Sequence, residues 1–145
     1  MYLQRLLLVV ALAGGWLAAC SANEAAPLPT RPTPTAATEQ ASYSNITPAQ
    51  LAERLKHKDF FLVNVHIPYE GEIAPTDAFI PYDQTDQLLG QYPADRQANI
   101  VVYCRSGRMS AIAAAKLVKV GYTNVWNLEG GMSAWEQAGF ELLKK

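Results

Sequence analysis

Residues 45–145 of this chain predict a single small α/β domain built on a parallel sheet. Two continuous apolar runs, at residues 60–65 and 99–104, are typical of strands that are buried on both faces. Amphipathic or alanine-rich segments that predict helices alternate with these runs along the chain. Because strands that alternate with helices form parallel sheets, the pattern predicts an α/β fold.

The first element of this domain is a short amphipathic helix at residues 48–57. Thr47 is a typical N-cap residue, and Pro48 fits the first helical position because it lacks an N–H. Leu51 and Leu55 are about one helical turn apart and would face the core. The remaining elements are expected in this order: a strand at 60–65, an irregular segment at 66–83, a helix at 85–91, a strand at 99–104, a helix at 109–120 ended by Gly121, a strand at 124–128, and a helix at 131–138 followed by Gly139.

Residues 1–19 predict a signal peptide that ends in a lipobox. Arg5 gives a positive start, and the uncharged apolar run at 6–17 is shorter than the roughly 20 residues that span a bilayer core. The Leu-Ala-Ala-Cys sequence that ends at Cys20 resembles the lipobox of bacterial lipoproteins, in which this cysteine is acylated. An ordinary secretory signal with a chance cysteine and an uncleaved anchor are the alternatives.

The lipobox resemblance implies an extracytoplasmic protein that is anchored to a bacterial membrane through Cys20. Ser21, rather than an aspartate, follows this cysteine, which favours the outer membrane if the organism has two membranes. Residues 20–44 then predict the lipidated cysteine and a disordered tether. The tether is rich in Pro, Thr and Ala, so it buries too little apolar surface to offset the entropy cost of ordering. Tyr43 is its residue most suited to pack on the domain.

The charge of the chain excludes one class of partner. The formal net charge is −1, and no block of like charge occurs. Because nucleic-acid-binding domains carry a basic patch or stripe, the sequence predicts no nucleic-acid partner. It also predicts no metal, since His66, Glu70, Glu72 and Asp77 lie in an irregular segment with a spacing that matches no metal-binding motif.

Cys104 is the main candidate for chemistry because it ends a predicted buried strand. Ligands of open parallel sheets bind at the carboxyl ends of the strands. The turn at 105–110 contains Gly107, and its backbone N–H groups, together with Arg105 and Arg108, would hold an anion and favour a thiolate. A buried structural cysteine is the alternative.

The cysteine content supports a reactive role for this thiol. The chain has two cysteines, so acylation of Cys20 would leave Cys104 unpaired outside the cytoplasm, where thiols are exposed to oxidation. A disulfide between the two is the alternative.

Residues 100–139 resemble the rhodanese-like domain family through two separate motifs. The sequence Ile-Val-Val-Tyr-Cys-Arg-Ser-Gly-Arg-Met-Ser at 100–110 is similar to the family's active-site strand and loop. The sequence Leu-Glu-Gly-Gly-Met-Ser-Ala-Trp at 128–135 is similar to its Leu-x-Gly-Gly-x-x-x-Trp motif, with Trp135 expected in the core. Residues 46–65 fit the family's opening helix and first strand more loosely. The resemblance implies a central, mostly parallel sheet with helices on both faces.

The same resemblance implies a sulfurtransferase that needs no cofactor. The thiolate of Cys104 would take a sulfane sulfur from a small anionic donor, thiosulfate or a persulfide. The resulting cysteine persulfide would pass this sulfur to cyanide or a thiol. Loop N–H groups would stabilise the anionic persulfide and the departing sulfite. The substrate-binding loop implied in this way consists of Arg105, Ser106, Gly107, Arg108, Met109 and Ser110.

Three departures from the family pattern leave open a sulfur carrier or a binding-only domain. Asn64-Val65-His66 stands where the family usually has Asp-Val-Arg, and it places His66 at the rim of the expected pocket. Residues 71–78 replace the usual Gly-His-Ile-Pro-Gly-Ala sequence, and the segment before them is shorter. Met109 holds a loop position that is often Arg. The sequence names no protein partner.

A cysteine phosphatase or arsenate reductase is a further alternative because it uses a similar loop. Such a loop has Cys, five residues and then Arg, so that a guanidinium clamps the phosphate. Here Ser110 holds this position, and Arg108 comes two residues early. The sequence therefore favours sulfur transfer over phosphate chemistry.

Overall fold

The structure is a computed structural model that describes residues 42–144. The predicted signal peptide, Cys20 and nearly all of the predicted tether lie outside the described residues. The strands of the described part are β1 (Ser44–Ile46), β2 (Phe61–Asn64), β3 (Ala78–Phe79), β4 (Asn99–Tyr103) and β5 (Asn124–Leu128). They form one five-stranded sheet in the order β1-β5-β4-β2-β3, and every neighbouring pair is parallel.

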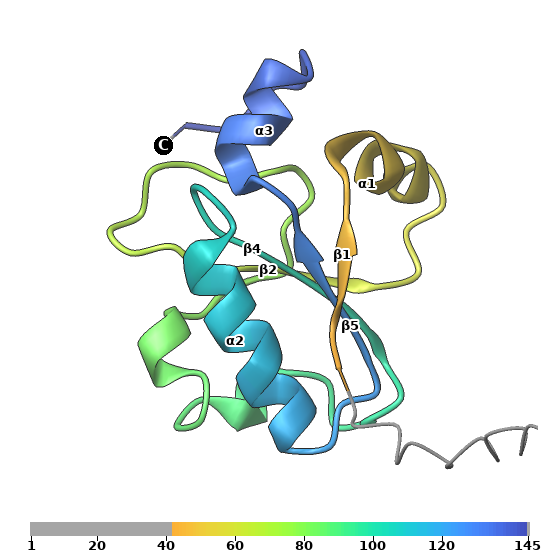
Figure 1. Ribbon diagram of the computed structural model, residues 1–145, viewed down its shortest axis with the longest axis vertical. Helices are drawn as coiled ribbons and strands as arrows, with labels where there is room; N and C mark the ends of the chain where they lie inside the picture. The colour runs from red at the N-terminus through yellow and green to blue at the C-terminus, as the bar shows by residue number, and fades with distance from the viewer. Residues whose placement is uncertain (1–41, 145) are drawn as a thin grey trace, which may run out of the picture. The chain divides into compact units, whose positions relative to one another are not determined.

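Helices cover both faces of this sheet (Figure 1). The helices are α1 (Pro48–Leu55), α2 (Arg108–Lys119) and α3 (Gly131–Gln137). Val102 in β4 points to the α2 face, where it shares a core cluster with Leu117. Its neighbour Val101 points to the other face, where Leu51 of α1 and Trp135 of α3 complete a second cluster. The predicted α/β architecture is therefore confirmed, including the place of Trp135 in the core.

The start of α1 follows the predicted capping pattern. The Thr47 hydroxyl accepts a hydrogen bond from the Gln50 N–H at 3.3 Å, and the Thr47 N–H donates to Gln50 Oε1 at 2.9 Å. This capping box satisfies N–H groups that have no partner inside the helix. The helix ends at Leu55 rather than residue 57, because the N–H groups of Lys56 and His57 bond to carbonyls only three residues back.

The predicted helix at 85–91 is wrong. The structure has two short 3₁₀ turns instead: η1 (Tyr82–Gln84) directly precedes this stretch, and η2 (Leu89–Gln91) lies at its end. The buried Thr85 donates its hydroxyl to the Tyr82 carbonyl at 3.0 Å, which closes the first turn locally. Gly90 within the stretch and Pro93 just after it both disfavour a continuous helix here.

β1 and β3 are strands that the sequence does not predict. β3 pairs only Ala78 and Phe79 with β2, and β1 pairs Ser44–Ile46 with β5. Strands of two or three residues are too short to show a periodic pattern. Tyr43 packs against the α2-side core cluster. Tyr43 and Ser44, which fall within the predicted tether, therefore belong to the folded unit.

No helix within residues 42–144 is both long enough and apolar enough to cross a membrane.

Tyr103 is expected to make the fold sensitive to alkaline pH. It is fully buried, and burial raises its pKa from 10.0 to about 12. Its hydroxyl accepts the Ile73 N–H at 3.0 Å and lies 2.6 Å from the Thr76 hydroxyl. The unfolded chain loses this proton from about pH 10 and the folded chain only near pH 12. The free energy of unfolding should therefore fall by up to about 1.4 kcal/mol per pH unit in that window.

The measurement is urea unfolding of the wild type and Tyr103→Phe between pH 7 and pH 11. Tyr103→Phe leaves a buried N–H without its acceptor, so it should cost about 1–3 kcal/mol at pH 7. Tyr103→Phe should also lose less stability than the wild type above pH 10. Part of the alkaline loss should remain, because burial also raises the pKa of Tyr92 to about 12. Equal alkaline slopes for the two proteins would contradict this account.

Candidate active site

Cys104 lies directly after the central strand of the sheet. β4 ends at Tyr103, and α2 begins at Arg108, so Cys104 opens the loop that joins them. The Val65 N–H donates to the Tyr103 carbonyl at 2.9 Å, which continues the pairing of β2 with β4 up to this point. Cys104 therefore occupies the carboxyl edge of the sheet, where open parallel sheets bind their ligands.

The sulfur of Cys104 faces hydrogen-bond donors of its own loop. The Gly107 N–H donates to Sγ at 3.1 Å, and the Ser110 hydroxyl lies 3.4 Å from the same sulfur. The Ser110 hydroxyl also lies 3.1 Å from the Gly107 carbonyl oxygen, so its single proton can be donated to one of the two acceptors at a time. Cys104 is only 1% exposed. The loop is thus arranged to stabilise negative charge on a sulfur that is shielded from bulk water.

The conformation of this loop depends on two glycine positions. Gly107 has a φ of +88°, a left-handed conformation that costs a residue with a Cβ energy. Gly131 touches the loop from the start of α3, where a Cβ would lie 2.2 Å from the Cys104 carbonyl oxygen. This close approach lets the Met132 N–H donate to that oxygen at 2.8 Å and the Ser133 N–H donate to the Arg105 carbonyl at 3.0 Å. The Gly-Gly motif therefore seats α3 on the cysteine loop.

The side chains of the predicted substrate loop divide into two groups. Gly107 and Ser110 are buried and contact the sulfur, whereas Arg105, Ser106 and Arg108 are exposed. The remaining loop residue, Met109, is half-buried and packs against the α2-side core. The position that bears Arg in a phosphatase loop is thus taken by the Ser110 hydroxyl, which is directed at the sulfur.

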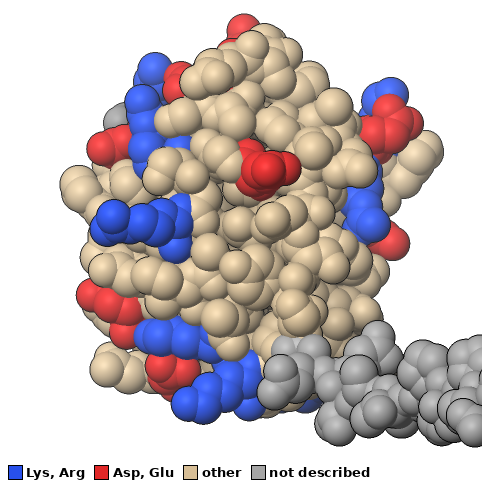
Figure 2. Space-filling model, in the orientation of Figure 1, with Lys and Arg blue, Asp and Glu red and all other residues tan. Residues whose placement is uncertain are grey.

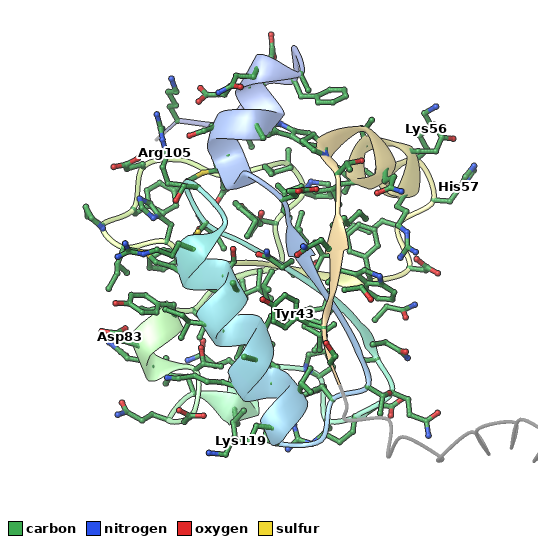
Figure 3. The ribbon with its side chains drawn as sticks, in the orientation of Figure 1. Tyr43, Lys56, His57, Asp83, Arg105 and Lys119 are labelled. Carbon is green, nitrogen blue, oxygen red and sulfur yellow. The ribbon has the colours of Figure 1, made fainter. Side chains whose placement is uncertain are left out.

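Arg105 is engaged by carboxylates at the mouth of the loop. Its Nη1 lies 3.4 Å from Glu70 Oε2 and 3.9 Å from Glu136 Oε2. Figure 3 shows its side chain at the outer edge of the domain, beside α3 and far from His57 at the end of α1. On the face drawn in Figure 2, lysine and arginine side chains are separated by acidic and neutral ones. The positive charge next to Cys104 is therefore partly neutralised.

The segment after β2 places His66 beside this loop. His66 is 7% exposed, and its Nε2 lies 3.5 Å from Glu70 Oε2. Asn64 shapes the segment, because its Oδ1 accepts the His66 N–H at 3.0 Å and its Nδ2 donates to the Gly71 carbonyl at 2.8 Å. A carboxylate at this position has no proton to donate to Gly71. The departure from Asp thus has a structural purpose in this chain.

The C-terminal tail, which follows α3, also holds the segment after β2 in place. Glu72 and Leu143 exchange two backbone hydrogen bonds of 2.8 Å in an antiparallel bridge. The Trp135 indole N–H donates to the Glu141 carbonyl at 2.9 Å, which holds the tail against α3. No sequence pattern predicts this bridge, because it joins single residues that are distant along the chain.

Among residues 42–144, no three His, Cys, Asp or Glu side chains gather as metal ligands. The segment that carries His66, Glu70, Glu72 and Asp77 instead contacts other parts of the domain. Asp77 accepts the Leu62 N–H at 2.7 Å and pairs with Lys58 at 2.6 Å.

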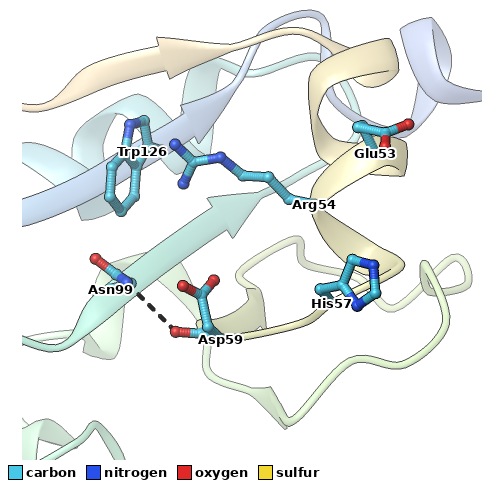
Figure 4. Close-up of a pocket in the computed structure, with 6 residues that line it drawn as sticks. All are labelled: Glu53, Arg54, His57, Asp59, Asn99 and Trp126. Carbon is cyan, nitrogen blue, oxygen red and sulfur yellow. Dashed lines mark hydrogen bonds between the residues drawn. The ribbon is translucent and has the colours of Figure 1, made fainter.

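A separate groove lies near the amino ends of the central strands (Figure 4). Arg54 extends over the Trp126 ring, with the guanidinium carbon 4.6 Å from the ring centre. The Asn99 amide donates to the Asp59 carbonyl at 3.3 Å below this pair. Because β4 runs from Asn99 in this groove to Tyr103 just before Cys104, the groove lies at the opposite edge of the sheet. It holds no nucleophilic thiol.

Comparisons with known proteins agree with this fold. The family model described as the rhodanese-like domain matches residues 47–138. A sulfurtransferase from Allochromatium vinosum is 33% identical over 103 residues, which cover 69% of this chain and 94% of that protein. The thiosulfate sulfurtransferase GlpE from Pseudoalteromonas translucida is 26% identical over 72% of this chain and 99% of its own length. A rhodanese-related protein from Thermoplasma volcanium has a solved structure that matches with a TM-score of 0.61 and 27% identity, over 71% of this chain and 100% of that chain.

The matched region and its cysteine loop define the class of this protein. The chain belongs to the rhodanese-like domain family. Its relatives within that family include sulfurtransferases.

Proposed function

We propose that this chain transfers sulfane sulfur through a persulfide on Cys104. The observation that carries the proposal is the environment of Sγ, which receives the Gly107 N–H at 3.1 Å and faces the Ser110 hydroxyl at 3.4 Å. In the first half-reaction, the Cys104 thiolate attacks the outer sulfur of thiosulfate. The sulfur–sulfur bond of the donor breaks, and sulfite leaves with the electron pair.

The second half-reaction returns Cys104 to its starting state. Cyanide or a thiol attacks the outer sulfur of the persulfide, and the electron pair of the broken bond returns to Cys104 Sγ. Thiocyanate or a new persulfide leaves. The Gly107 N–H, which is fixed in place before the reaction, stabilises negative charge on the sulfur in both steps. A low-molecular-weight persulfide is the alternative donor to thiosulfate.

The experiment that tests this function measures sulfur transfer by the full chain with two donors and two acceptors. Thiosulfate and an alkyl persulfide are each paired with cyanide and with a thiol, and thiocyanate or the new persulfide is quantified. We expect turnover with at least one pair. Persulfide formation without turnover would favour a sulfur carrier, and aryl phosphate hydrolysis would favour a phosphatase.

We further propose that the domain works at an extracytoplasmic membrane surface, held by a lipid on Cys20. The support is the Leu-Ala-Ala-Cys sequence that ends at Cys20 after a short apolar run. Acylation with more than one chain anchors a protein stably, whereas a single chain binds only marginally. The folded domain would then present Cys104 at the end of the tether.

Cys20→Ala is expected to move the full-length protein from the membrane fraction to the soluble fraction. The measurement is fractionation of cells followed by detection of the domain. Ser21→Asp is the matched control, because it keeps the acylated cysteine and should remain in a membrane fraction. Unchanged membrane association of Cys20→Ala would argue for an uncleaved apolar anchor.

A further inference from the structure

His66 is a buried side chain whose polar atoms lack hydrogen-bond partners among the described residues. Neither Nδ1 nor Nε2 makes a hydrogen bond there, although the residue is only 7% exposed. Leaving a buried polar group unsatisfied is costly, so native structures rarely keep one without a role. Glu70 is an acid beside this ring, and its Oε2 lies 3.5 Å from Nε2. An imidazole beside a carboxylate is suited to accept a proton.

This pair lies next to the cysteine loop. The Val65 N–H bonds to the Tyr103 carbonyl, so the residues that follow, His66 and Cys104, leave adjacent strands at the same edge of the sheet. Glu70 joins the two segments directly, because the same Oε2 that faces His66 lies 3.4 Å from Nη1 of Arg105. Glu70 therefore links His66 to the loop that begins at Cys104.

Charged side chains from three parts of the domain surround the pair of His66 and Glu70. Glu70 faces His66 from the same segment and is 42% exposed, which connects the pair to solvent. Arg105 of the cysteine loop bonds to Glu70 and, at 3.9 Å, to Glu136 of α3. Lys144 of the C-terminal tail lies 3.5 Å from Glu136. Acidic and basic side chains therefore alternate around the pair.

We propose that His66, held by Glu70, takes the proton from a thiol acceptor as that thiol discharges the Cys104 persulfide. The inference rests on the proposed function and assigns its acceptor class. The S–H bond of the acceptor breaks, and its proton moves to the imidazole of His66. The thiol sulfur bonds to the outer sulfur of the persulfide, and the old sulfur–sulfur bond leaves its electron pair on Cys104 Sγ. One sulfur atom changes carrier, and no oxidant or reductant is consumed.

A proton acceptor serves this half-reaction and not the loading from thiosulfate. Thiosulfate brings no proton that must be removed, whereas an alkyl thiol is mostly protonated near neutral pH, since its pKa is about 8.5. The thiolate is the attacking species, so a base at the mouth of the loop accelerates the attack below that pH. Above it, solvent ionises the acceptor and the base becomes unnecessary.

The test is a single-turnover discharge of the full chain. Cys104 is loaded with thiosulfate, excess donor is removed, and the persulfide is mixed with L-cysteine without oxygen at pH 6.5 and pH 9.5. We expect His66→Gln to discharge about 10- to 100-fold more slowly than the wild type at pH 6.5. The two proteins should react at similar rates at pH 9.5. Glu70→Gln, a change at a more exposed position, should show a smaller loss with the same pH pattern.

Two further variants separate proton transfer from other effects. His66→Arg places a permanent cation beside Glu70 and has no free base, so it should be as slow as His66→Gln at pH 6.5. His57→Gln changes an exposed histidine at the end of α1, far from the loop, and should match the wild type at both pH values (Figure 3).

Three results would overturn the proposal. They are a wild-type rate for His66→Gln at pH 6.5, an equal loss at both pH values, and recovery in His66→Arg. If the wild-type chain accepts no sulfur from any donor, the proposed function itself fails and this inference falls with it. Normal loading followed by pH-independent discharge rejects only the role of His66.

Discussion

Cys104→Ser is expected to reduce sulfur transfer by at least about a thousandfold, because a serine hydroxyl is a far weaker nucleophile toward sulfur than a thiolate. The substitution is nearly isosteric, and the hydroxyl can still accept the Gly107 N–H that now reaches Sγ. The fold should therefore survive, and the loss should lie in the chemistry. Steady-state transfer from the best donor to cyanide or a thiol is the measurement.

Cys20→Ala is the matched control for this experiment, because it removes the other cysteine of the chain. Assayed in detergent, it should retain the transfer rate of the wild type. Residual transfer by Cys104→Ser above a few per cent would mean that another group carries the sulfur. It would also mean that the buried, hydrogen-bonded environment of Cys104 does not serve sulfur transfer.

Gly131→Ala is expected to lower the free energy of unfolding by at least about 3 kcal/mol. The added Cβ would lie 2.2 Å from the Cys104 carbonyl oxygen and 2.8 Å from the carbonyl carbon of Arg105, both of them backbone atoms. The φ of +58° adds about 1–2 kcal/mol for a residue with a side chain. To relieve the overlap, α3 must move away and weaken the bond from the Met132 N–H to the Cys104 carbonyl.

Urea unfolding measures this loss, and the rate of persulfide loading measures its effect on the loop. Gly90→Ala is the control, since nothing lies within 4 Å of its added Cβ and its φ is not positive. It should change stability by less than about 1 kcal/mol. A Gly131→Ala protein as stable as Gly90→Ala would refute the close packing of α3 on the cysteine loop.

The sheet and its main helices follow from local sequence patterns. The apolar runs of β2 and β4 have no polar side, which is what burial under helices on both faces requires. Thr47 and Gln50 form the capping box at the start of α1 that the predicted N-cap favours. The errors fall where elements are short. The stretch at 85–91 forms isolated turns, and β1 and β3 exist only because longer strands accept them at the sheet edges.

The candidate site is predictable in part, for a similar reason. Cys104, Gly107 and Ser110 are close along the chain, so their spacing predicts that the donors lie near the sulfur. The contacts of Glu70 with His66 and Arg105 depend on how two loops leave neighbouring strands, which no local pattern contains.

The role of the motif glycine Gly131 likewise depends on a tertiary contact. Gly131 belongs to a segment that carries the family resemblance, and only the structure gives the physical reason for it. The reason is the approach of its Cα to the Cys104 carbonyl, a tertiary contact between α3 and the loop.

The mass of the peptide that contains Cys104 tests the central claim most directly. The full chain is treated with thiosulfate, then with an alkylating reagent that preserves persulfides, and the peptide is analysed by mass spectrometry. We expect a gain of one sulfur atom on Cys104, which is absent when cyanide or a thiol is added before the alkylating reagent. A chain that stays unmodified with thiosulfate and with alkyl persulfides would contradict it.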